Sequence, residues 1–148
     1  MTIHAFRALG PAALLRATAP RLAAMKGEAA ADLITHLRNG APALSENPAM
    51  ARALIGAVAT LAPVLHHRET SPEILRDTLG PLADQLRDHG LAPRGYIALR
   101  AAFLSTIARC LGPDPALLGA WDAAIGTMLA TMMTAAHGPR AHTTPLAA

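Results

Sequence analysis

The chain has very few of the residues that build β-sheets. Valine occurs only as Val58 and Val64, and aromatic residues make up 3% of the sequence. Strands are enriched in β-branched and aromatic residues, whereas alanine, leucine, arginine and methionine favour helices. The 148 residues suffice for one domain with one core, and a hydrophobic content of 52% excludes disorder for the chain as a whole. We therefore expect a single all-α domain.

Proline and glycine divide the sequence into six expected helices. Asn47-Pro48, Ser71-Pro72 and Asp114-Pro115 each join a residue that caps a helix N-terminus to a proline suited to the first turn. Gly80-Pro81 could kink or split the fourth helix, and residues 41–46 are expected to form a polar link. The domain is expected to span residues 11–137, with tails at 1–10 and 138–148. The expected helices cover residues 12–25, 28–39, 48–65, 72–89, 93–111 and 115–137.

The charge pattern argues against a nucleic-acid partner. The net charge is +3, and the arginines and the single Lys26 are scattered rather than grouped into a basic stripe. Cys110 is the only cysteine, so no disulfide forms within the chain, as suits a reducing compartment. The longest apolar run, residues 53–65, is shorter than the roughly 20 residues needed to span a membrane. We expect a cytoplasmic protein without a membrane span.

No motif for catalysis stands out in the sequence. We find no nucleophile motif, no glycine-rich phosphate loop and no pair of carboxylates arranged for acid–base work. The histidines lie near the ends of the chain or of expected helices, where a solvated or helix-stabilising role is the usual one. They do not have zinc-ligand spacing. The chain is therefore not expected to be an enzyme.

The C-terminal half of the chain resembles a known family. The stretches HGLAPRGYIALRAAFLSTIARCLG and LLGAWDAAIGTMLATMM are similar to bacterial haemoglobins and to the globin domain of flavohaemoglobins. The family has a glycine-hydrophobic corner, a tyrosine six residues later, a long helix ending in Leu-Gly, and a helix with Ala-Trp. With LLRATAPRL similar to the first globin helix, the resemblance covers most of residues 12–136 and implies a globin-like sandwich of about six main helices. The matching positions are Gly90-Leu91, Tyr96, Leu111-Gly112 and Ala120-Trp121.

The residues that hold haem in this family are missing. A proximal histidine normally stands four residues before the corner glycine, and that place is Leu86 here. The distal tyrosine falls at or near Ile34, and the link after the second helix lacks the phenylalanine that clamps haem. Flavohaemoglobins also have a tyrosine–glutamate pair. Tyr96 matches the tyrosine, but the position of the glutamate corresponds to about Ala136 here. The resemblance therefore implies that no cofactor is bound.

These features predict a globin-like domain that has lost haem binding and acts as a sensory or protein-interaction module. We expect a homodimer or a complex with another protein. The alternative is a haem protein that handles oxygen or nitric oxide, with His89 as a shifted proximal ligand; a helical bundle unrelated to globins is a third reading. The fifth and sixth helices should pack antiparallel. The residues expected to line or fill a vestigial pocket are Leu82, Leu86, Tyr96, Leu99, Phe103, Ile125 and Met128.

Overall fold

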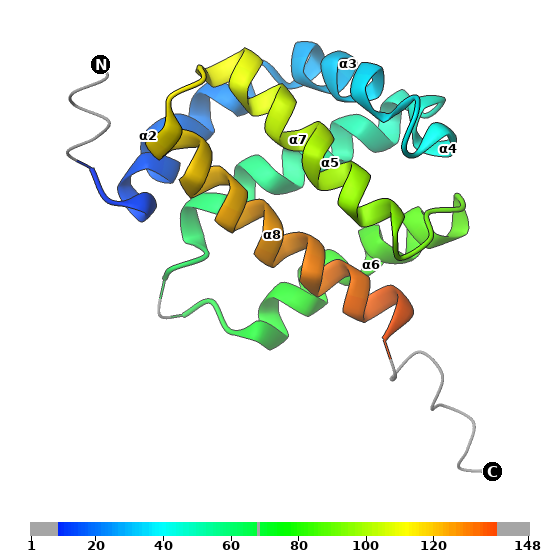
Figure 1. Cartoon of the computed structure of the whole chain (residues 1–148). Coiled ribbons are helices and arrows are strands. Elements are labelled where there is room, and N and C mark those ends of the chain that lie inside the picture. Colours follow the sequence, from blue (N-terminus) through cyan, green and yellow to red (C-terminus); the bar gives the residue numbers. More distant parts are fainter. Residues whose placement is uncertain (1–8, 68, 139–148) are drawn as a thin grey trace.

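The all-α class is confirmed by the computed structural model of the chain. It describes residues 9–67 and 69–138, and in these ranges the chain forms helices and turns and no strand (Figure 1). Most expected helices are found within a few residues of their predicted bounds. The helices are α2 (Pro11–Ala24), α3 (Lys26–Leu37), α4 (Pro42–Ser45), α5 (Pro48–Leu61), the 3-10 helix η1 (Ala62–Val64), α6 (Pro72–Asp88), α7 (Gly95–Leu111) and α8 (Pro115–His137).

Three helices begin at the cap-and-proline pairs of the sequence. The side chains of Asn47, Ser71 and Asp114 each accept a hydrogen bond from the backbone N–H three residues further on, over 3.1, 3.2 and 3.0 Å. Each of these bonds satisfies one N–H group that has no partner within the helix. The predicted starts of α5, α6 and α8 are therefore confirmed.

Some expectations about the connections need correction. The predicted polar link at residues 41–46 contains the short helix α4, because Leu44 turns into the core and is only 1% exposed. Gly80-Pro81 does not split α6, which runs unbroken through Pro81. The predicted fifth helix, which is α7, begins at Gly95 rather than at Pro93. The predicted third helix, which is α5, ends at Leu61 rather than at residue 65 and passes into η1. Of the predicted tails at residues 1–10 and 138–148, residues 1–8 and 139–148 lie outside the described residues.

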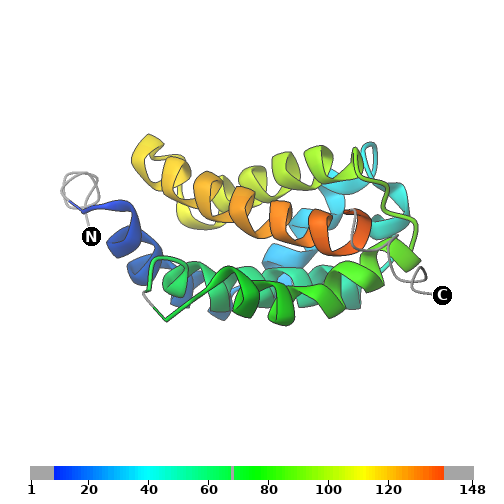
Figure 2. The ribbon, with the colours of Figure 1, turned by 90° about the horizontal axis from the view of Figure 1, so that it is seen from below.

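The helices form two layers (Figure 2). The helices α2, α5 and α6 lie in one layer, and α7 and α8 lie side by side in the other. The helix α3 packs on α5 and on α7, whereas α2 and α6 both pack on α8. The expected antiparallel packing of α7 on α8 is confirmed, with a turn at residues 112–114 between them (Figure 1).

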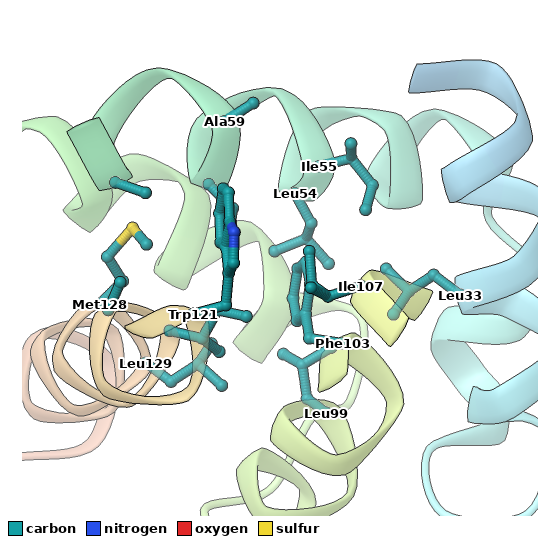
Figure 3. Close-up of a cluster of buried hydrophobic side chains, with 14 of the residues drawn as sticks. Leu33, Leu54, Ile55, Ala59, Leu99, Phe103, Ile107, Trp121, Met128 and Leu129 are labelled. Atoms are coloured by element: carbon teal, nitrogen blue, oxygen red, sulfur yellow. The ribbon is translucent and has the colours of Figure 1, made fainter. Parts of the chain in front are cut away.

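The core lies between these layers and is centred on two large aromatic side chains. Trp121 and Phe103 have no exposed surface, and leucine, isoleucine and methionine side chains from α3, α5, α7 and α8 surround them (Figure 3). The indole N–H of Trp121 donates to the hydroxyl of Thr18 over 3.0 Å. The Thr18 hydroxyl in turn donates to the Leu14 carbonyl over 2.7 Å. This buried chain of hydrogen bonds joins α2 to α8.

Candidate functional site

The seven residues expected in the vestigial pocket lie in or against the core. Those with little or no exposed surface form part of one continuous apolar cluster, and Leu82 packs partly buried against it. These side chains pack together in the interior, and Tyr96 also lines a surface groove. The exposed fractions are 0% for Leu86, Leu99, Phe103 and Ile125, 1% for Met128 and 5% for Tyr96.

The core-facing residues of α6 offer no ligand for haem iron. Leu86 lies on the buried side of α6, which packs on α8, and its side chain has no atom that could ligate iron. The neighbouring positions of α6 that face the core are Leu79 and Ala83, which are equally unable to bind iron. The described residues also contain no group of three or more His, Cys, Asp or Glu side chains that could hold a metal ion.

His89, the alternative proximal ligand, stands at the surface. It is the residue after the last turn of α6 and its side chain is exposed. Its Nδ1 lies 2.8 Å from the carbonyl oxygen of Gln85, where an Nδ1–H would donate. His89 follows Leu86 by three residues, so bringing it to the buried position of Leu86 would require a displacement of about one helical turn at the end of α6.

A polar cluster that the sequence did not predict joins α3 to α7. The carboxylate of Asp32 accepts a hydrogen bond from the buried Thr106 hydroxyl over 2.9 Å. It also pairs with His36 Nε2 at 3.2 Å and with Arg109 Nε at 3.5 Å. Burial and the nearby Asp32 carboxylate raise the pKa of the Cys110 thiol in the same cluster. Since the Asp32 oxygens already have these partners, the cluster holds two helices together and leaves a weakly nucleophilic cysteine.

This polar cluster borders a surface hollow of about 570 Å³ between α3 and α7. Both apolar and charged side chains line it, and the Arg109 side chain at its edge is 76% exposed. The raised pKa of Cys110 disfavours the thiolate, so the thiol that lines the hollow is a weak nucleophile at neutral pH. The lining residues are Met25, Glu28, Ala31, Asp32, Thr35, Arg109 and Cys110.

Tyr96 contacts the last residue of α8. Its ring and that of His137 meet edge to face, with ring centroids 6.3 Å apart. The Tyr96 hydroxyl and His137 Nε2 are both buried without a hydrogen-bond partner among the described residues. Burial, in competition with the positive charge of Arg87, raises the pKa of Tyr96 to about 12. Tyr96 is thus neutral at physiological pH and packs against His137. It matches the tyrosine of the flavohaemoglobin tyrosine–glutamate pair only by the family resemblance.

The outer side of α7 and α8 forms an apolar face with a groove of about 290 Å³. Ile97 on α7 is 75% exposed and Met133 on α8 is 37% exposed. The guanidinium of Arg100 on α7 pairs with the Asp122 carboxylate on α8, at 2.7 Å between Nε and Oδ1. We call this surface the α7–α8 face; the residues lining its groove are Pro93, Tyr96, Ile97, Arg100, Gly126, Leu129, Ala130 and Met133.

Searches of protein families, curated proteins and solved structures find nothing that matches the chain. The globin resemblance therefore stays a prediction. Among the described helices, α8 alone is long and apolar enough to cross a membrane, and 44% of its most apolar stretch is buried inside the protein.

Proposed function

We propose that this chain is a globin-like domain that binds no haem and works by contact with protein. Two layers of helices with a shared apolar core are compatible with a globin-like sandwich. The filled interior and the leucine at position 86 support the loss of haem. The exposed His89 gives no support to the shifted-ligand alternative.

The observation that carries the proposal is the apolar, exposed α7–α8 face. Ile97 and Met133 both expose apolar surface beside this groove, and apolar surface gathered around a groove can serve as a contact site. The described surface offers no metal cluster, and its only cysteine is a poor nucleophile, so the contact surface is the feature best suited to a function.

Titration with haemin tests the loss of haem. We expect weak, heterogeneous binding without a sharp Soret band at one equivalent, because Leu86 and the other core-facing residues of α6 cannot supply an axial ligand. The variant His89→Ala should behave like the wild type. Stoichiometric binding that His89→Ala abolishes would overturn the proposal and establish the haem alternative.

Site-specific photo-crosslinking in living cells tests the contact function. A benzophenone amino acid replaces Ala130, which is exposed on the α7–α8 face, or Ala53, an exposed alanine on α5 as a matched control. We expect crosslinked protein species from position 130 and none from position 53. Equal crosslinking from both positions, or none from position 130, would contradict a contact function for this face.

A further inference from the structure

The outward side of α8 carries almost no charge. Between Pro115 and His137 the only ionisable side chains are Asp122 and His137 itself. The solvent-facing side of a soluble helix is normally rich in charged residues. Here the exposed positions include Ala123, Ala130 and Met133. Such a surface is typical of a helix that packs against another helix.

The threonines of α8 make this side less polar than the sequence suggests. The hydroxyl of Thr127 donates to the Ala123 carbonyl over 3.1 Å, and that of Thr131 donates to the Thr127 carbonyl over 2.9 Å. Each hydroxyl proton is therefore used within the helix. Small side chains with satisfied hydroxyls allow a second helix to approach closely.

The same face carries both a projecting side chain and a groove. Ile97 is 75% exposed, more than any other large hydrophobic residue described, and it stands at the edge of the groove between α7 and α8. Its neighbours in the groove, Leu129, Ala130 and Met133, are apolar. A surface that holds both the projection and the recess can pair with itself about a two-fold axis.

The charges on this face are also self-complementary. Arg100 and Asp122 form an exposed pair, with side chains 46% and 41% exposed. Gly126 lies under the guanidinium, and a Cβ there would stand 3.0 Å from the nearest Arg100 atoms, so glycine lets Arg100 lie across α8. In a two-fold arrangement the Arg100 of one copy can face the Asp122 of the other. One face thus supplies both members of an intermolecular pair.

We infer that the occupant of the α7–α8 face is a second copy of this chain, so that α7 and α8 of two copies form a four-helix interface. This inference rests on the proposed contact function and names its partner. A lipid surface fits less well, because helices that lie on membranes combine bulky apolar residues with several lysines or arginines. The outward side of α8 has small residues, and α8 itself has no lysine or arginine.

Sedimentation equilibrium of the full chain over a wide concentration range tests the inference. We expect a dimer for the wild type, and Ile97→Glu should weaken association about tenfold or more, because it places two carboxylates in an apolar contact. The matched control is Ile74→Glu, which alters an isoleucine that is 50% exposed on α6. The control should dimerise as the wild type does, and circular dichroism should show that both variants are folded.

A charge exchange makes the test specific for a second copy. Arg100→Glu leaves two acidic side chains on the face and Asp122→Lys leaves two basic ones. Each variant alone should be monomeric at low salt, because like charges meet across the two-fold axis. A mixture of the two should form a heterodimer, since opposite charges then meet. Such rescue in the mixture would show that the pairs join different chains.

The other outcomes overturn the inference. A wild type that stays monomeric at all concentrations, or a dimer that Ile97→Glu leaves intact, rules out a second copy on this face. Flotation of the monomer with phosphatidylglycerol–phosphatidylcholine vesicles, lost in Ile97→Glu, would assign the face to lipid instead. A monomer that still crosslinks to a different protein from position 130 would refute the dimer while leaving the proposed contact function in place.

Discussion

The substitution Thr18→Val isolates the buried hydrogen bond between α2 and α8. Valine has nearly the same shape as threonine, so the substitution leaves no cavity at this fully packed position, where Thr18 is 1% exposed. It removes the acceptor for the indole N–H of Trp121, which has no exposed surface and no other hydrogen-bond partner in the described structure. The Leu14 carbonyl loses only the second of its two donors, because the backbone N–H of the same helix still reaches it.

The expected cost follows from the Trp121 N–H that is left buried without an acceptor. A buried donor without a partner costs about 1–3 kcal/mol. Both residues are β-branched, so their helix propensities nearly cancel. For a chain of this size, roughly 2–4 °C in Tm accompany each kcal/mol. Thr18→Val should therefore lower the free energy of unfolding by about 1–3 kcal/mol.

Urea denaturation followed by Trp121 fluorescence and by circular dichroism measures this cost. Trp121 is the only tryptophan, so its emission reports on the site itself. The control is Thr78→Val on α6, where an exposed threonine makes the same hydroxyl-to-carbonyl bond to Ile74 over 2.8 Å. That change should alter the free energy of unfolding by less than about 0.5 kcal/mol. Equal effects of the two substitutions would refute the importance of the Trp121 bond.

Three further predictions concern the core, the tyrosine and the cysteine. Leu86→Ala should lower the free energy of unfolding by about 2–5 kcal/mol in the same assay, because Leu86 has no exposed surface; a neutral effect would contradict its packing. Tyr96 is the only tyrosine, and its absorbance at 295 nm should show ionisation near pH 12 in the folded protein. Because the folded state retains this proton to a higher pH than the unfolded state, the free energy of unfolding should fall between pH 10 and about 12. Cys110 should react with iodoacetamide at pH 8 more slowly than glutathione does, and Asp32→Asn should speed the reaction by lowering the pKa of Cys110; an unchanged rate would exclude the influence of Asp32.

Local signals in the sequence determine much of this fold. The cap-and-proline pairs at Asn47, Ser71 and Asp114 place three helix starts because they act on backbone groups within three residues. The same local reasoning fails at Gly80-Pro81. There, packing of Leu79 and Ala83 in the core holds α6 continuous in spite of the lost hydrogen bond.

The sites depend on contacts that no short stretch of sequence contains. Asp32 and Thr106 are 74 positions apart, and their hydrogen bond exists only because α3 packs on α7. The stripe of leucines on α6 correctly indicates that Leu86 is buried. The sequence of α7 does not show in the same way that Ile97 is exposed, because the exposure of Ile97 depends on where α8 packs against α7.

The hydrogen bond between Thr18 and Trp121 also bears on how the chain folds during synthesis. The two residues are 103 positions apart, so at about 5–20 residues per second a ribosome takes roughly 5–20 s to add Trp121 after Thr18. Until then the part of α2 that packs on α8 has no partner, although α5 and η1 are already available to cover the rest. The nascent chain therefore leaves the α8-facing part of α2, including Thr18, uncovered until α8 emerges, and a ribosome-associated chaperone can bind there.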